Sequence, residues 1–230
     1  MITLATAARI LRQLRHDRRT VGLLIVVPAA LLALLYFMYD GAPAFDRVAL
    51  VMLGVFPFVI MFLVTSIAML RERTSGTLER LLTTPLRKLD LLFGYGLAFG
   101  LAGAVQALVA VAAAHWLFGL ETPAGSVLVA VVDAVLGMAL GLLCSAFART
   151  EFQAVQFIPV VVAPQLFLCG LFVPRDEMAG WLQAVSDVLP LTYAVKALAA
   201  ATVWRDLAVV AGAAVLALIL AAATLRRRTG

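Results

Sequence analysis

Six long apolar stretches, separated by short charged segments, are the feature that most constrains how this chain can fold. They cover residues 21–39, 48–70, 91–120, 127–148, 152–173 and 207–225. Each comes close to or exceeds the ~20 residues that a helix needs to cross the hydrocarbon core of a bilayer. Because a backbone in lipid must satisfy its own hydrogen bonds, the pattern predicts an all-α integral membrane protein with six transmembrane helices.

The composition agrees with a membrane protein. The chain is 64% hydrophobic and 13% charged, whereas soluble domains are ~45–50% apolar and ~25% charged. Six spans leave room only for short connections, so residues 1–230 are predicted to form a single membrane domain.

Lysine and arginine residues are divided unequally between the two sides that six spans define. The N-terminal segment, the segment between the second and third spans, the link at Arg149 and the C-terminal tail carry 14 of the 18. Positive residues favour the cytoplasmic side of a membrane. The chain is therefore predicted to lie in the inner (plasma) membrane of the cell, with both termini in the cytoplasm. The net charge of +5 is explained by topology, and no nucleic-acid partner is predicted.

Two segments outside the spans are predicted to lie at the membrane surface. Within residues 1–20, Leu4, Ala7, Leu11 and Leu14 recur at helical spacing among basic residues, which predicts an amphipathic helix on the inner leaflet. The alternative is a basic leader that only sets the topology.

Residues 174–205 form the second such segment, on the outer side. Asp187 and Pro190 interrupt its apolar pieces, which predicts short re-entrant helices between the fifth and sixth spans. Two interpretations stay open, an aromatic anchor at the headgroups and a gate over an export path. The candidate gate residues are Pro174, Trp181, Pro190 and Tyr193.

Polar residues and prolines inside the spans mark a candidate pathway. Asp133 is the one formal charge within a predicted span, and such carboxylates usually face a bundle interior or a wet cavity. The alternative is a later helix start that leaves Asp133 near the outer water. Prolines kink a helix, and glutamines in lipid require partners. The candidate pathway residues are Asp133, Gln156, Pro159, Pro164 and Gln165.

Two pairs of glycines have the spacing that lets helices approach closely. Gly96 and Gly100 lie four residues apart in the third span, and Gly137 and Gly141 do so in the fourth. This spacing permits close contact either within one subunit or across a dimer.

The charged segment at residues 71–90 lies between the second and third spans. Leu78, Leu81 and Leu82 form an apolar face, Gly76 precedes it and Pro85 ends it. This pattern predicts a short cytoplasmic helix built to dock on a leaflet or a soluble partner. By contrast, the sequence contains no Gly-rich phosphate loop, no Cys/His cluster with metal-ligand spacing and no Ser/His/Asp set, so neither a catalytic residue nor a metal site is predicted.

Two stretches resemble the ABC type-2 exporter permeases, the membrane subunits of one class of ATP-binding-cassette exporter. "RERTSGTLERLLTTPLRKLDLLFGY" at residues 71–95 is similar to that family's cytoplasmic signature. "GLFVPRDEMAGWLQAVSDVLPLTYAVKAL" at residues 170–198 is similar to its outer re-entrant segment. The resemblance implies that residues 1–20 are a connecting helix and that residues 71–90 contain a coupling helix.

The resemblance also implies partners and contact residues. A separate cytoplasmic ABC ATPase, in two copies, would bind ATP and magnesium, and a second permease copy, identical or different, would complete the path among membrane lipids. A second, smaller contact with the ATPase falls at Arg149 and Glu151. The residues assigned to ATPase coupling are Arg71, Glu72, Arg73, Gly76, Thr77, Leu78, Glu79, Arg80, Leu81, Leu82 and Pro85.

The expected function is therefore export of a small hydrophobic or amphiphilic molecule, either drug-like or lipid-like. Two alternatives come from other classes of protein. One is a secondary transporter driven by protons through Asp133, and the other is a membrane scaffold that only recruits a partner.

Overall fold

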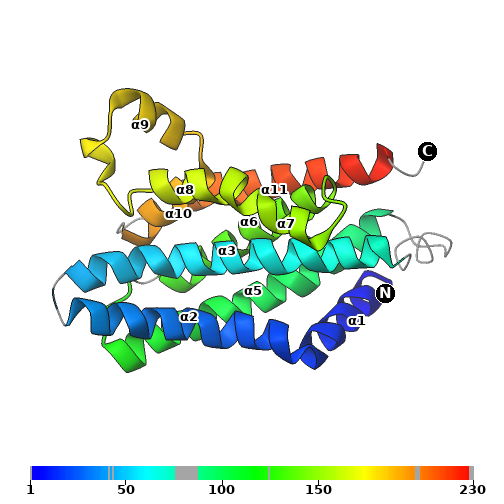
Figure 1. Ribbon diagram of the computed structural model, residues 1–230, viewed down its shortest axis with the longest axis horizontal. Helices are drawn as coiled ribbons and strands as arrows, with labels where there is room; N and C mark the ends of the chain where they lie inside the picture. Colours follow the sequence, from blue (N-terminus) through cyan, green and yellow to red (C-terminus); the bar gives the residue numbers. More distant parts are fainter. Residues whose placement is uncertain are drawn as a thin grey trace.

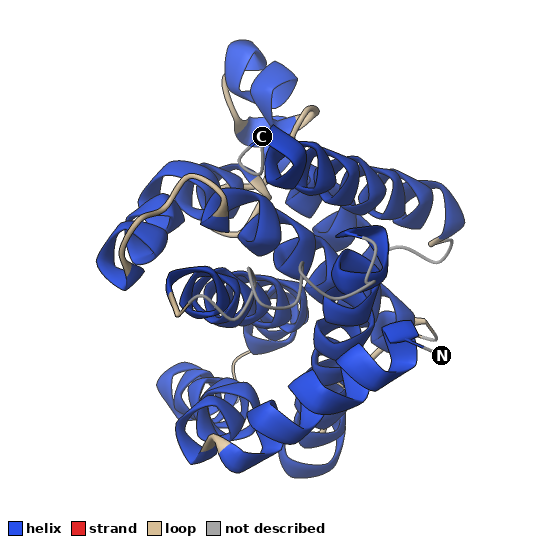
Figure 2. Ribbon diagram, turned by 90° about the vertical axis from the view of Figure 1, so that its right-hand side faces the viewer, coloured by secondary structure: helices blue, strands red, loops and turns tan. Residues whose placement is uncertain are grey.

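The computed structural model describes residues 2–40, 42, 44–75, 88–123, 125–199 and 203–227. All regular structure within these residues is helical (Figure 2). The coupling residues predicted at positions 76–85 lie outside the described residues.

Among the described residues, six helices are long and apolar enough to cross a membrane. They run side by side along the longest axis of the molecule (Figure 1). The prediction of an all-α membrane protein with six spans is thereby confirmed. The helices are α2 (Arg18–Tyr39), α3 (Ala44–Thr74), α5 (Lys88–Phe118), α6 (Ser126–Ser145), the continuous run of α7 (Glu151–Phe157), η1 (Ile158–Val162) and α8 (Ala163–Leu168), and α11 (Trp204–Arg227).

Three of these helices, α5, α6 and α8, end before the apolar runs that predict them, and glycines follow two of the three. Gly119 follows α5 with a φ of 66°, and the N–H of the next residue, Leu120, donates to the carbonyl of Ala114. Gly170 follows α8 with a φ of 97°. Glycine adopts this left-handed backbone without a steric penalty and commonly terminates helices, so these residues stop the helices although the hydropathy continues.

The first helix, α1 (Ile2–His16), lies at an angle to α2 at one end of the bundle (Figure 1). Asp17 separates the two helices and caps α2, because its carboxylate accepts the Thr20 N–H at 3.3 Å and the Thr20 hydroxyl at 2.7 Å. An aspartate at this position satisfies an otherwise unpaired N–H of the first helical turn. The end of α11 lies at the same end of the molecule as α1 (Figure 1).

The closest helix contact in the core joins α3 and α6. A Cβ atom placed on Gly137 would lie 2.2 Å from the carbonyl oxygen of Phe58, and one on Gly141 would lie 2.5 Å from that of Phe62. The backbones of α3 and α6 therefore touch over one helical turn. The glycine spacing allows contact either within one subunit or across a dimer, and Gly137 and Gly141 make contact within one subunit.

The fifth membrane helix contains a π-helical turn, η1, which includes Pro159 and ends two residues before Pro164. The N–H of Ala163 donates to the carbonyl of Ile158, five residues earlier. Pro164 has no N–H to donate, and a proline ring clashes with the carbonyl four residues earlier in a regular α-helix. The wider π turn accommodates both features without ending the helix.

The segment between the fifth and sixth membrane helices consists of η2 (Arg175–Glu177), α9 (Gly180–Ser186) and α10 (Pro190–Ala199). It lies at the opposite end of the molecule from α1 (Figure 1). The buried hydroxyl of Ser186 donates to the carbonyl of Leu168 at 2.8 Å and lies 3.1 Å from the hydroxyl of Thr192. These contacts fix α9 and α10 to the end of α8. Re-entry of these helices into a membrane stays a prediction.

Candidate functional site

The last turn of α3 places three consecutive predicted coupling residues, Arg71, Glu72 and Arg73, against three different neighbours. Successive residues of an α-helix point about 100° apart, so a run of three covers most of the circumference. The run lies immediately before the segment 76–87, which contains the predicted coupling face. We call Arg71, Glu72 and Arg73, together with the contacts they make, the α3 terminus.

Arg71 forms a bidentate ion pair with Glu151, the first residue of α7. Its Nε lies 2.7 Å from one carboxylate oxygen of Glu151, and its Nη2 donates to the other at 3.1 Å. The side chains are 59% and 51% exposed, so the pair contributes about 0.2–1 kcal/mol, as exposed ion pairs do. The structure thus brings together two predicted sites that lie 80 residues apart in the sequence.

Glu151 is held in place by the start of α7. Thr150 caps this helix, its hydroxyl accepting the N–H of Gln153 at 3.2 Å. The N–H of Arg149 donates to the side-chain oxygen of Gln153 at 2.8 Å, and the Arg149 side chain is exposed. An acidic residue in the first turn also complements the helix dipole. The predicted second contact is therefore a defined helix start beside the α3 terminus.

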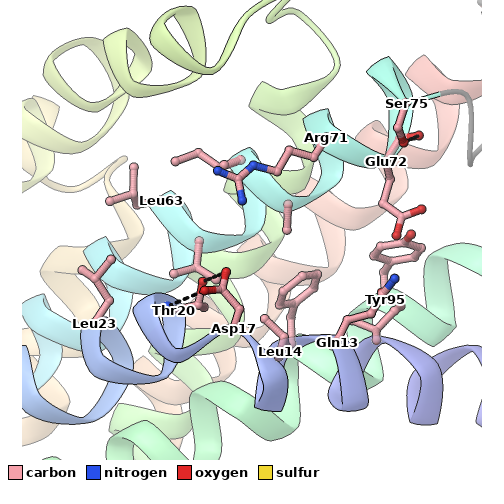
Figure 3. A pocket seen from close by; sticks show the side chains of 15 residues that line it. Gln13, Leu14, Asp17, Thr20, Leu23, Leu63, Arg71, Glu72, Ser75 and Tyr95 are labelled. Atoms are coloured by element: carbon pink, nitrogen blue, oxygen red, sulfur yellow. Dashed lines mark hydrogen bonds between the residues drawn. The ribbon is translucent and has the colours of Figure 1, made fainter.

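Glu72 faces α1 and α5. Its side chain is only 13% exposed, and one carboxylate oxygen lies 3.6 Å from Nη2 of Arg9. The same Arg9 nitrogen donates to the hydroxyl of Tyr95 at 3.3 Å, and Tyr95 points toward the Glu72 carboxylate (Figure 3). The other Glu72 oxygen, Oε2, has no hydrogen-bond partner among the described residues.

Arg73 donates from its guanidinium to the carbonyl of Ser145, the last residue of α6. The carbonyls of the last helical turn lack intrahelical partners, and a cation there is favourable. Through these three residues, the α3 terminus contacts α1, α5, α6 and α7. The sequence interpretation missed Arg9, Tyr95 and Ser145, because no spacing along the chain connects them with residues 71–73.

A cavity of about 740 Å³ lies beside the α3 terminus, between α1, α2, α3 and α5 (Figure 3). Its wall includes Arg71, Glu72 and Tyr95, and Asp17 and Thr20 contribute from the junction of α1 and α2. This cavity was not predicted from the sequence, because it depends on the angle between α1 and α2.

The predicted pathway residues fall into separate environments. Asp133 is 0% exposed, and neither carboxylate oxygen has a hydrogen-bond partner among the described residues. A Cβ atom on Gly54 of α3 would lie 3.6 Å from its Oδ2 and 3.0 Å from Leu198 of α10. Asp133 thus lies in the interior of the single subunit.

The four predicted residues of the fifth helix divide between an outer and an inner face. Gln156, Pro159 and Pro164 are exposed on this subunit. Gln165 is buried, where its side-chain nitrogen donates to the carbonyl of Val161 at 3.0 Å and its oxygen accepts the N–H of Leu191 at 3.4 Å. Gln165 therefore links the fifth helix to the start of α10.

The predicted gate residues have structural roles in the segment between the fifth and sixth membrane helices. Pro174 precedes η2, and Pro190 begins α10. The hydroxyl of Tyr193 donates to the carbonyl of Asp187 at 2.7 Å, which joins α10 to the end of α9. Trp181 of α9 is 69% exposed.

Comparison with known proteins places this arrangement in a family. The family model described as "ABC-2 type transporter" matches residues 2–203, which include the α3 terminus, the cavity and the helices α9 and α10. The chain belongs to the ABC-2 type transporter family. This finding confirms the family expected from the resemblance of residues 71–95 and 170–198.

Several curated relatives are permeases of ABC transporters. This ABC-2 chain is 26% identical over 180 residues to the linearmycin resistance permease protein LnrN of Bacillus subtilis, an alignment that covers 75% of this chain and 46% of LnrN. It is 28% identical over 134 residues to the probable multidrug ABC transporter permease YbhR of Escherichia coli, covering 57% and 36%. With YbhS of the same organism, identity is 27% over 146 residues, covering 61% and 38%. The chain spans less than half the length of each of these relatives.

Proposed function

We propose that this ABC-2 chain is the permease subunit of an exporter in which a separate nucleotide-binding subunit hydrolyses ATP. ATP and magnesium bind to that partner, and this chain carries the substrate across the inner membrane with both of its termini in the cytoplasm. The observation that carries the proposal is the α3 terminus. Because residues 71–73 contact four neighbouring helices, a movement of residues 76–87 would be transmitted directly to the helix bundle.

The substrate proposed is a small hydrophobic or amphiphilic molecule, drug-like or lipid-like. The names of the relatives, which refer to linearmycin resistance and to multidrug transport, support this class. The contacts of the α3 terminus do not distinguish a drug from a lipid as the substrate.

The path is proposed to form between two permease copies, identical or different, each with its own ATPase copy. Gln156, Pro159 and Pro164 lie on an exposed face of the fifth helix. A glutamine facing lipid would leave its amide without hydrogen-bond partners, which is unfavourable in a hydrocarbon environment. A second copy against this face would supply partners or enclose a wet path.

The test is substitution of Leu81, at the centre of the predicted coupling face, by aspartate. Leu81→Asp is expected to leave membrane insertion intact and to abolish both co-purification of the ATPase and its substrate-stimulated hydrolysis. Thr83→Asp is the matched control, because position 83 lies on the opposite side of the predicted helix. Full stimulated ATPase activity in Leu81→Asp would contradict the proposal, and binding without stimulation in the unmodified chain would indicate a recruitment scaffold.

A second candidate, a proton-driven transporter, is favoured by one observation. Asp133 is entirely buried, and its carboxylate has no hydrogen-bond partner among the described residues, as in a proton-carrying site. This candidate requires transport that continues in proteoliposomes without ATP and stops in Asp133→Asn. The proposed exporter instead requires ATP for transport.

A further inference from the structure

The cavity beside the α3 terminus, which we call the elbow pocket, is polar at one end and apolar at the other. Along α3 its lining changes from apolar side chains at Leu63 and Ile67 to charged ones at Arg71 and Glu72. Along α3, the rise from Leu63 to Glu72 is about 13 Å, close to the ~15 Å depth of one leaflet's hydrocarbon. The pocket therefore has the length and polarity of an amphiphile lying in one leaflet with its head toward the α1 end.

The Glu72 carboxylate at the polar end can accept a further hydrogen bond. Oε2 of Glu72 is buried and has no hydrogen-bond partner among the described residues. A buried carboxylate oxygen without a partner is costly, and in native proteins such an atom usually has an unobserved water, ion or ligand beside it. The side chain lines the pocket, so a donor can reach it from there.

The charges around this end favour a cationic head group. Arg71, on the same wall, is paired with Glu151 at 2.7 Å. Arg9 is shared between the other Glu72 oxygen and the Tyr95 hydroxyl. Asp17 adds a further carboxylate across the pocket from α3 (Figure 3). Arg71 is attracted to Asp17 as well as to Glu151, so Glu72 is the carboxylate at which an ammonium head is favoured over an anionic one.

We propose that the elbow pocket binds an amphiphile with an ammonium head, seated at Glu72, and an apolar body lying along α3 toward Leu63. The site belongs to a single subunit and does not depend on the proposed partner ATPase. An occupant would contact α1, α3 and α5 together. Its binding would therefore be linked to the position of the α3 terminus.

The experiment uses the full chain in lipid nanodiscs and a photoreactive dodecylammonium probe, with labelled peptides mapped by mass spectrometry. Labelling is expected in the pocket-lining parts of α1, α3 and α5. Unlabelled dodecylammonium should compete with the probe, whereas dodecanoate, which has the same chain and an anionic head, should not.

Two substitutions test the pocket itself. Glu72→Gln keeps the shape and removes the charge, and it should weaken competition by dodecylammonium about tenfold, the effect of losing one hydrogen bond to a charged group. Ala68→Phe should abolish labelling by filling the cavity, since Ala68 lines it. Leu216→Phe is the control, because Leu216 is 57% exposed on α11 and does not line the pocket.

Nanodiscs of phosphatidylethanolamine and of phosphatidylglycerol identify the source of the occupant. Weaker labelling in phosphatidylethanolamine points to a membrane lipid with an amine head, and equal labelling points to a free amphiphile; both results support the site. Labelling spread evenly over lipid-facing helices, equal competition by dodecanoate, or unchanged competition by dodecylammonium in Glu72→Gln would overturn the proposal.

Discussion

Substitution of Gly137 by alanine gives the sharpest test of the helix packing. The added Cβ would lie 2.2 Å from the carbonyl oxygen of Phe58, whereas real Cβ contacts essentially never fall below 3.0 Å. The obstacle is backbone, so it cannot rotate away, and α3 and α6 must separate. Overpacking of this kind costs about 1–3 kcal/mol, and a fixed backbone obstacle places Gly137→Ala near the upper limit.

Helix propensity opposes this cost. Alanine is favoured over glycine in a helix interior by up to ~1 kcal/mol, which leaves a net destabilisation of about 2 kcal/mol for Gly137→Ala. Gly212→Ala in α11 isolates the propensity effect, because a Cβ atom there would meet nothing within 4 Å. That control is expected to be neutral or stabilising by up to ~1 kcal/mol.

The two variants are compared by equilibrium unfolding in lipid–detergent micelles, followed by the fluorescence of Trp116, Trp181 and Trp204. The double variant Gly137→Ala/Gly141→Ala should cost less than the sum of the two single variants, because one separation of the helices relieves both clashes. Equal midpoints for Gly137→Ala and Gly212→Ala would refute the close contact of α3 with α6.

Two further predictions concern polar contacts between helices. A double-mutant cycle on Arg71 and Glu151 should give a coupling energy of about 0.2–1 kcal/mol that falls in 1 M salt, as for an exposed ion pair; a coupling that salt does not change would contradict the surface pair. Gln165→Leu leaves the buried N–H of Leu191 without its partner, which should cost about 1–3 kcal/mol and speed hydrogen exchange in α10. Gln156→Leu, at an exposed position, should leave exchange in α10 unchanged, and equal exchange in both variants would show that Gln165 does not hold this helix.

Hydropathy predicted the membrane helices well because the bilayer imposes the same length and polarity on every span. The ends were less predictable, since they depend on single residues such as Gly119 and Gly170, whose backbone conformation is not encoded in an apolar count. The spacing of Gly137 and Gly141 predicted a close helix approach. It carried no information on the partner, because any helix with a matching surface satisfies it.

The polar contacts of the candidate site were less accessible to sequence reasoning. Residues 71 and 151 were each singled out by family resemblance, yet their pairing depends on the end of α3 lying at the same level of the bundle as the start of α7. Arg9 is one of several arginines in the first twenty residues, and nothing in the local pattern distinguishes it. The role of Gln165 also depends on tertiary structure, since its partner Leu191 lies 26 residues away.

The long helix α3 connects the two ends of the molecule that the proposed function requires to communicate. Its last turn is fixed to α1, α6 and α7, and its N-terminal half lies against α10 at Gly54. Pro57, buried between these regions, removes one backbone hydrogen bond and is the position where the helix bends most easily. The contact of Phe58 with Gly137 lies directly beside it. In an exporter driven from residues 76–87, this contact would act as the pivot of α3, so Gly137→Ala should alter coupling between ATPase and transport as well as stability.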